Sequence, residues 1–216
     1  FNTDNTMEQQ FVAFNVEGMN HVDKMVENLL YNTLSYMNEN AKATPATISK
    51  LKPSEVEELS YKSLVEVAPS VNFPKERIDL VSGHVFPDIL LHETSYGVEI
   101  KSTKEDKWTS IGSSVVESTR NADTDKVYML FAKLGGEPTF RCKPYQQCLS
   151  RIAVTHSPRY LIDMNLNDDK NISTCTVEHP LSACHPIAYF PLSNPSFHFS
   201  VDYCCSNNSK CSASLS

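Results

Sequence analysis

The chain has 216 residues, of which 40% are hydrophobic and 21% are charged, and its formal net charge is −7. These values are ordinary for a globular chain that is large enough to bury one good core. The acidic balance argues against an indiscriminate nucleic-acid binder. No run of about 18 apolar residues occurs, so the sequence predicts neither a transmembrane helix nor a membrane partner.

Charge is unevenly distributed along the chain. Residues 1–97 hold 7 lysines and arginines against 14 acidic residues, and residues 161–216 hold 2 against 5. Residues 98–160 hold 10 against 7, which makes them the only segment with a positive balance. This segment indicates a phosphate-binding face, and the acidic remainder would limit non-specific binding. The alternative is a lysine-rich surface that is only solvated.

Residues 1–66 are predicted to form a helical region. The polar stretch Asn38–Ser49 contains a proline and is predicted to be a loop. A second helix is predicted to begin at Pro53, with Ser54 as its N-cap, and to end at Pro69. The first helix is predicted from apolar residues at steps of three and four: Val22, Met25, Val26, Leu29, Leu30, Thr33, Leu34 and Met37.

Two apolar runs of strand length follow, and each carries charge. Phe86–Leu91 and Gly97–Ser102 are joined by His92–Tyr96, so they are predicted to form a hairpin. Buried charges are costly unless they are paired or bound to a metal. Side chains alternate along a strand, so Glu99 and Lys101 share one face.

A site is therefore predicted on this hairpin. If the hairpin is centred near Thr94 and Ser95, Asp88 lies opposite Lys101. Two carboxylates and one lysine then meet on one face of a sheet. Mg²⁺ binds to one or two carboxylates together with waters and a substrate phosphate, so this arrangement suits metal-assisted hydrolysis. An ordinary amphipathic hairpin with surface charges is the alternative.

The same residues resemble a known family. Pro87–Asp88, ten intervening residues and Glu99–Ile100–Lys101 are similar to the PD-(D/E)xK nuclease superfamily, which includes many type II restriction endonucleases. The resemblance implies that Asp88 and Glu99 bind Mg²⁺, with the Ile100 carbonyl as a further ligand. It also implies that Lys101 is the catalytic lysine. The fold that it implies is an α/β (α+β) sandwich, with a central mixed β-sheet flanked by helices.

The activity implied by this resemblance is that of a type II restriction endonuclease. Such an enzyme hydrolyses double-stranded DNA at a specific sequence, leaves 5′-phosphates, acts as a homodimer and lies in the cytoplasm of a bacterium or archaeon. Members of the family often carry one more glutamate on a helix before the sheet, and Glu27, Glu58 and Glu66 are candidates. A structure-specific repair or recombination nuclease and a non-catalytic nucleic-acid-binding module are the alternatives.

The segments around the motif support an α/β arrangement. A helix is predicted at 111–120, and strands at 77–82, 126–132, 139–143 and 160–164. Lys104 and Lys107 are candidates for contacts to DNA phosphates, and Arg159 is a candidate for a contact to a base. Trp108 is expected either to stack on a base or to be partly buried, and His156 is expected to be structural.

Three regions result from this reading: the helical region 1–66, a nuclease core at 67–165, and an extension at 166–216 that is expected to pack into one compact domain with them. The extension holds Cys175, His179, Cys184 and His185, whose spacing is close to that of a structural Zn²⁺ site. Free thiols are the alternative for these cysteines. The sequence begins without a methionine, which suggests that it is not the whole translated product.

Overall fold

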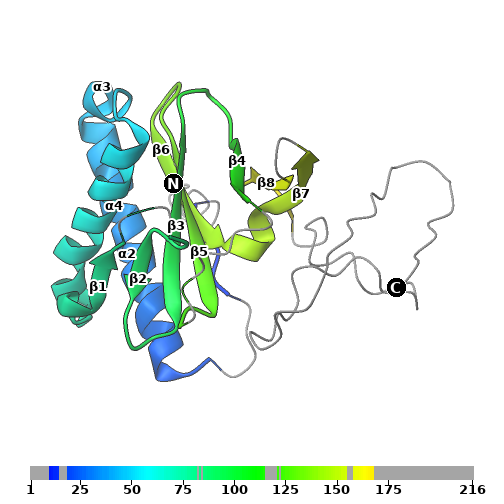
Figure 1. Cartoon of the computed structure of the whole chain (residues 1–216). Helices are drawn as coiled ribbons and strands as arrows, with labels where there is room; N and C mark the ends of the chain where they lie inside the picture. Colours follow the sequence, from blue (N-terminus) through cyan, green and yellow to red (C-terminus); the bar gives the residue numbers. More distant parts are fainter. Residues whose placement is uncertain are drawn as a thin grey trace, which may run out of the picture.

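The computed structural model describes residues 10–14, 19–81, 83, 85–114, 121, 123–154 and 158–167. These residues form a mixed α/β structure (Figure 1), in which helices lie on one side of a central sheet and a second, smaller sheet lies on the other. The predicted α/β class is therefore confirmed. The zinc candidates Cys175, His179, Cys184 and His185, and also His156, lie outside the described residues.

The helical layer consists of α2 (His21–Ala43), the short α3 (Pro45–Ile48) and α4 (Pro53–Val67). The predicted loop at 38–49 is wrong, because α2 continues through Asn38 and Ala41, which are both buried. The Asn38 side chain accepts a hydrogen bond from Phe140 N–H and donates one to the Phe140 carbonyl. These two bonds tie the helix to the sheet, and the polar composition of the segment conceals them.

Helix α4 begins at Pro53, as predicted, but its N-cap is Lys52 and not Ser54. Lys52 N–H donates to the Glu55 carboxylate at 2.6 Å, which satisfies one of the backbone groups outside the helical ladder. Proline fits the first helical position because it has no N–H to satisfy. The chain then passes through the 3₁₀ helices η1 (Ala68–Val71) and η2 (Lys75–Arg77) into the sheet.

The central sheet has five strands in the order β1-β2-β3-β5-β6. Strands β3 and β5 are parallel and the other neighbours are antiparallel. All five strands were expected from the sequence. Their bounds are β1 (Ile78–Leu80), β2 (Ile89–Leu91), β3 (Tyr96–Thr103), β5 (Lys126–Lys133) and β6 (Thr139–Pro144).

The register of the β2–β3 hairpin differs from the predicted one. Leu91 pairs with Tyr96 and Ile89 pairs with Val98, so the turn is centred one residue earlier than expected. Glu93 and Ser95 adopt positive φ angles of 64° and 61°, which close this tight turn. Ile89 lies opposite Val98, so Asp88, the residue directly before β2, lies next to Glu99 rather than opposite Lys101. A turn centred one residue earlier moves the position across from Asp88 by two residues, and this even shift leaves the alternation of faces along β3 as predicted.

The second sheet contains β4 (Thr109–Ser114), β7 (Leu149–Val154) and β8 (Pro158–Asp163), in the order β4-β8-β7. The 3₁₀ helix η3 (Tyr145–Cys148) leads into it. The predicted helix at 111–120 is wrong over 111–114, and 115–120 lie outside the described residues. Ile111 pairs with Leu161 of β8, and this long-range pairing overrides the weak local pattern.

The central sheet separates two apolar cores. Alternate residues of β3 and β5 face the helices and pack with α2 and α4: Tyr96, Val98, Ile100, Tyr128, Leu130 and Ala132. The residues between them on β5, Val127, Met129 and Phe131, face the second sheet and pack against Leu149 and Ile162. Residues 97, 99 and 101 of β3 alternate with its helix-facing positions, so Glu99 and Lys101 belong to the second face.

The N-terminal segment 10–14 is extended, whereas residues 1–66 were predicted to be helical. Phe11 makes a parallel bridge to Cys142 of β6, and Val12 N–H donates to the Cys142 carbonyl at 2.9 Å. Strand β6, the last in the order of the central sheet, is thus partly covered on its outer side. Within the described part of the chain, no helix has both the length and the apolar character that crossing a membrane requires.

Candidate functional site

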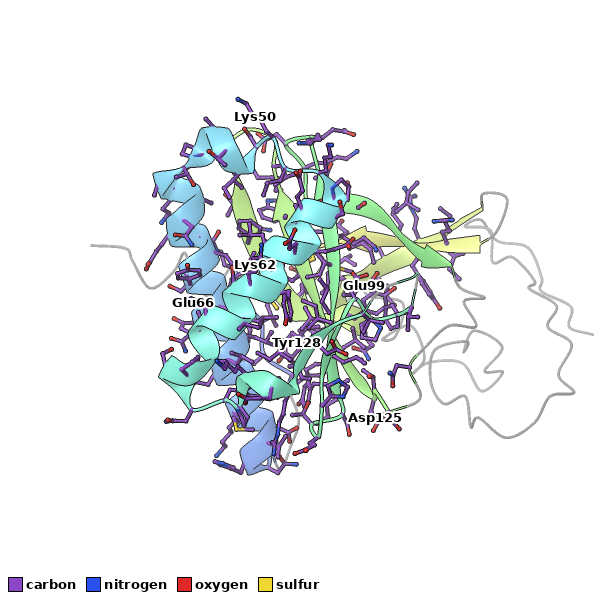
Figure 2. The ribbon with its side chains drawn as sticks, turned by 60° about the vertical axis from the view of Figure 1, so that its left-hand side comes forward. Lys50, Lys62, Glu66, Glu99, Asp125 and Tyr128 are labelled. Carbon is purple, nitrogen blue, oxygen red and sulfur yellow. The ribbon has the colours of Figure 1, made fainter. Side chains whose placement is uncertain are left out.

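The structure brings Asp88, Glu99 and Lys101 together at the β2–β3 hairpin. Asp88 comes directly before β2, and its backbone carbonyl accepts a hydrogen bond from Val81 N–H at 2.9 Å. Its Oδ2 accepts a second hydrogen bond from Ile100 N–H at 2.7 Å. The carboxylate is thereby attached to β3 in the middle of the predicted motif. Figure 2 shows where Glu99 lies on the central sheet.

Glu99 and Lys101 form an ion pair on the same strand. Lys101 Nζ lies 2.6 Å from Glu99 Oε1. The Glu99 side chain is only 4% exposed, and that of Lys101 is 26% exposed. Solvent can therefore reach the ammonium group more easily than the carboxylate beside it. The predicted meeting of two carboxylates and one lysine is present, although the partner that lies across from Asp88 differs.

Asp88 is held in an environment that disfavours its charged form. Burial raises the pKa of its carboxyl to about 7, and the neighbouring Glu99 carboxylate adds to this rise. The hydrogen bond from Ile100 N–H and the Lys101 ammonium both oppose the rise and do not cancel it. Perturbed carboxyl groups of this kind gather at functional sites.

The surroundings of Lys101, in contrast, favour its charged form. Burial lowers the pKa of its ammonium, but the Glu99, Asp88 and Glu57 carboxylates together raise it above the ordinary value. Lys101 is therefore protonated at neutral pH. In this state it donates hydrogen bonds and offsets negative charge, and it cannot accept a proton from water.

Glu57 is the glutamate of α4 that influences the charges of Asp88 and Lys101, and it was not among the glutamates predicted for this role. Its carboxylate raises the pKa of both Asp88 and Lys101. The candidates have other surroundings: Glu27 accepts hydrogen bonds from Phe14 N–H and Tyr128 Oη, Glu58 pairs with Lys62, and Glu66 is exposed. A signal was present, because Glu57 precedes the buried Ser60 and Leu64 by three and seven residues.

The donor set fits a hard divalent cation that keeps part of its water shell. Among the described residues, no group of three or more His, Cys, Asp or Glu side chains gathers closely enough to hold a metal ion. Mg²⁺ needs only one or two carboxylates when waters and a substrate phosphate complete its octahedron. Two adjacent carboxylates, one of them carrying a raised pKa, supply the negative charge that such an ion would neutralise.

The predicted DNA contacts lie on different parts of the structure. Lys104 Nζ donates to the Ser49 carbonyl at 2.9 Å, which links the end of β3 to the α3–α4 connection. Lys107 pairs with Glu105 at 2.8 Å, and Arg159 is exposed on β8. Their contact with DNA stays a prediction.

Trp108 is half-buried, which agrees with the second of the two environments predicted for it, partial burial. Its ring contacts Phe131, with 5.9 Å between the ring centroids, and the Arg141 guanidinium lies 3.9 Å from the Trp108 centroid. One ring face is therefore engaged by the protein itself. Trp108 also accepts, through its carbonyl, a hydrogen bond from Met164 N–H at 2.9 Å. It joins the second sheet to the central one.

A second buried polar cluster lies at the start of α2. Asp23 is 5% exposed, and its Oδ1 accepts hydrogen bonds from Tyr96 Oη and Lys126 Nζ, both at 2.7 Å. The carboxylate also forms a capping box with Asn20. The hydrogen bond from Lys126 leads among the contacts that lower the pKa of Asp23, to about 2. This cluster is a satisfied structural network.

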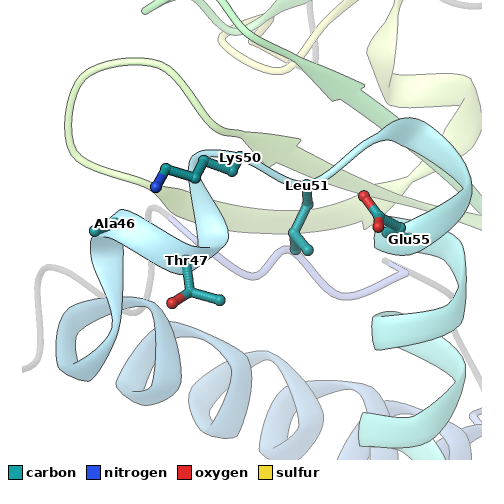
Figure 3. A pocket seen from close by; sticks show the side chains of 5 residues that line it. All are labelled: Ala46, Thr47, Lys50, Leu51 and Glu55. Atoms are coloured by element: carbon teal, nitrogen blue, oxygen red, sulfur yellow. The ribbon is translucent and has the colours of Figure 1, made fainter.

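A hollow between α3 and the start of α4 is lined by Ala46, Thr47, Lys50, Leu51 and Glu55 (Figure 3). None of the residues that line this hollow belongs to the hairpin site.

Cys142 and Cys148 are free, buried thiols. Burial raises the pKa values of both, in the case of Cys148 to about 12. They are therefore uncharged and unreactive near neutral pH.

Comparisons of the chain with protein-family models, with curated proteins and with solved structures found no match.

Proposed function

We propose that this protein is a Mg²⁺-dependent nuclease that hydrolyses phosphodiester bonds of double-stranded DNA. The observation that supports the proposal is the convergence of Asp88, Glu99 and Lys101 at the β2–β3 hairpin. In a purely structural cluster each carboxylate would be expected to have partners that lower its pKa, as Asp23 does. The pKa of the partly buried Asp88 carboxyl is instead raised to about 7, because burial and the Glu99 carboxylate outweigh Ile100 N–H and the Lys101 ammonium.

Asp88 and Glu99 are the residues that would hold the ion, together with the carbonyl of Ile100. When bound there, Mg²⁺ would lower the pKa of a coordinated water and would offset charge on the phosphoryl oxygens. Lys101, which is protonated at neutral pH, stabilises the negative charge that develops on the phosphate in the transition state. Water attacks phosphorus, the bond to the 3′ oxygen breaks, and a 5′-phosphate and a 3′-hydroxyl result.

Sequence-specific cleavage by a homodimer is the finer form of this proposal. It derives from the resemblance of Pro87–Asp88 and Glu99–Ile100–Lys101 to type II restriction endonucleases. One site cuts one strand, so a palindromic target requires two copies related by a two-fold axis.

The direct test is to incubate the protein with unmethylated phage DNA, in Mg²⁺ and in EDTA, beside Asp88→Ala and Lys101→Ala. Glu58→Gln is the matched control, since Glu58 lies next to Glu57 but pairs with the exposed Lys62. Discrete fragments that need Mg²⁺ and disappear in both site variants would support a sequence-specific nuclease. A smear with the same dependence would indicate a repair-type nuclease. Full cleavage by Lys101→Ala would exclude the proposed site.

A non-catalytic nucleic-acid-binding module is the second candidate. The ion pair between Lys101 and Glu99 favours it, because the two charges offset each other without a ligand. Under this reading DNA binding persists in EDTA and in Asp88→Ala, and no DNA is cut. A gel-shift assay on the same set of variants distinguishes the two candidates.

A further inference from the structure

The segment that carries Asp88 is held at several points. The Phe86 carbonyl accepts a hydrogen bond from Asn121 N–H at 2.9 Å, and the Phe86 ring contacts that of Tyr145, with centroids 5.2 Å apart. The Asp88 carbonyl is bonded to Val81 N–H. Between these two anchored residues lies Pro87, which has no N–H to donate and can be held only by packing and by its own carbonyl.

Pro87 packs onto β3 at Gly97. A side-chain carbon at position 97 would lie 2.3 Å from Pro87 Cγ, 3.1 Å from the Ile89 carbonyl oxygen and 3.1 Å from Thr124 Cγ2. The first separation is far shorter than any van der Waals contact, so the ring occupies the volume that a side chain at 97 would fill. The ring and the backbone around it are not free to move aside, because the neighbouring residues are bonded on both sides.

We propose that Gly97 is a positioning residue for Asp88: its missing side chain lets Pro87 lie on β3 and so places the Asp88 carboxylate against Ile100 N–H. Gly97 and Ile100 lie on the same strand, three residues apart. A side chain at position 97 would push Pro87 away from β3. Because Asp88 follows Pro87 directly, its carboxylate would then move away from Ile100 N–H. The proposal concerns packing, and it rests on the proposed function only in taking Asp88 as a metal ligand.

The test is Gly97→Ala, compared with Gly112→Ala in β4. The nearest atom to a carbon added at Gly112 is Ile162 Cδ1 at 3.0 Å, the flexible end of a side chain. Two quantities are measured at one fixed pH: the hydrogen-exchange rate of the Ile100 amide relative to the β5 amides, and the affinity for Mg²⁺ alone by calorimetry. In Gly97→Ala we expect Ile100 to exchange about tenfold faster and Mg²⁺ to bind about tenfold more weakly.

Gly112→Ala is expected to leave both quantities near the wild-type values. Unchanged exchange of Ile100 in Gly97→Ala, or a rise shared equally by the β5 amides, would overturn the proposal. If Gly97→Ala does not fold, Thr124→Ser replaces it, because it removes the methyl group that lies beside Gly97, in the place where Pro87 also packs, and keeps the hydroxyl. A smaller rise in Ile100 exchange is then expected, and no rise would contradict the proposal.

The outcomes also separate this inference from the nuclease proposal. If the wild-type protein binds no Mg²⁺ and cuts no DNA, yet Gly97→Ala still accelerates Ile100 exchange selectively, Gly97 positions Asp88 in a protein that is not such a nuclease. If Mg²⁺ binds and Gly97→Ala changes neither exchange nor affinity, the site stands and the positioning role is refuted.

Discussion

Asp23, which is buried, and Asp88, which is partly buried, are two aspartates with opposite electrostatic environments. Asp23 receives hydrogen bonds from Lys126, Tyr96 and Asn20, and its pKa lies near 2. Asp88 is bonded to Ile100 N–H and lies beside the carboxylate of Glu99, and its pKa lies near 7. The first environment stabilises a charge that the fold uses. The second leaves a charge under-compensated, which is the condition for recruiting a cation.

The largest difference between the two aspartates is expected when each is replaced by asparagine and DNA cleavage is measured. Asp88→Asn is expected to lower DNA cleavage by about 100-fold or more, because one ligand of the proposed ion and one negative charge are lost. Asp23→Asn is expected to leave cleavage per folded molecule unchanged. Initial rates of plasmid nicking in saturating Mg²⁺ measure both. Equal loss of activity in the two variants would remove the distinction between them.

Stability is expected to respond in the reverse order. Asp23→Asn removes the charge-assisted hydrogen bond to the partly exposed Lys126 ammonium, so unfolding should require about 2 kcal/mol less free energy. At pH 8, Asp88→Asn removes a charge that is costly to bury, so its free energy of unfolding is expected to equal or exceed that of the wild type. Urea denaturation of both variants, without added metal, gives the comparison. A large loss of stability in Asp88→Asn would show that Asp88 is a structural residue.

Asp88 and Asp23 are also expected to affect the pH dependence of stability in opposite directions. The folded-state pKa of Asp88 is raised from 3.8 to about 7, so the folded chain binds more protons than the unfolded chain between these values. Stability therefore falls as pH rises through this window, by on the order of 2–4 kcal/mol. Asp23, whose pKa is lowered to about 2, stabilises the fold above pH 4 and loses this effect as pH falls toward 2.

Denaturation midpoints of the wild type between pH 4 and pH 8, compared with those of Asp88→Asn, measure this difference. The variant should lack the fall in stability that the wild type shows as pH rises. Added Mg²⁺ should flatten the wild-type curve, because the ion binds the deprotonated carboxylate. Identical pH curves for the two proteins would contradict the raised pKa of Asp88.

The smallest expected effect is that of Glu57→Gln. Removal of this carboxylate should lower the pKa of Asp88 by less than about one unit, since Glu57 is the weakest of the influences on it. The midpoint of the pH-dependent stability change should move to lower pH accordingly. Glu58→Gln, one residue along α4 and paired with Lys62, should not move it.

Much of the fold could be read from the sequence, and the failures share one cause. The apolar run 126–132 forms β5, whose residues are buried on both faces, whereas in the run 86–91 only Ile89–Leu91 form a strand, β2. The segment 111–114 and the stretch 38–43 were misassigned, because their structure depends on distant partners, Leu161 and Phe140, that local composition does not reveal. Propensity is a weak prior wherever tertiary pairing decides the conformation.

Alternation along β3 was enough to predict that Glu99 and Lys101 share a face, and the spacing was enough to predict that Asp88 lies near them at the hairpin. The tertiary structure alone decided the register that puts Asp88 beside Glu99, the approach of Glu57 from α4, and the contact of Pro87 with Gly97. The physical reason is that alternation along a strand is a local property of the backbone. Register, helix placement and the desolvation that sets a pKa depend instead on residues far apart in the chain.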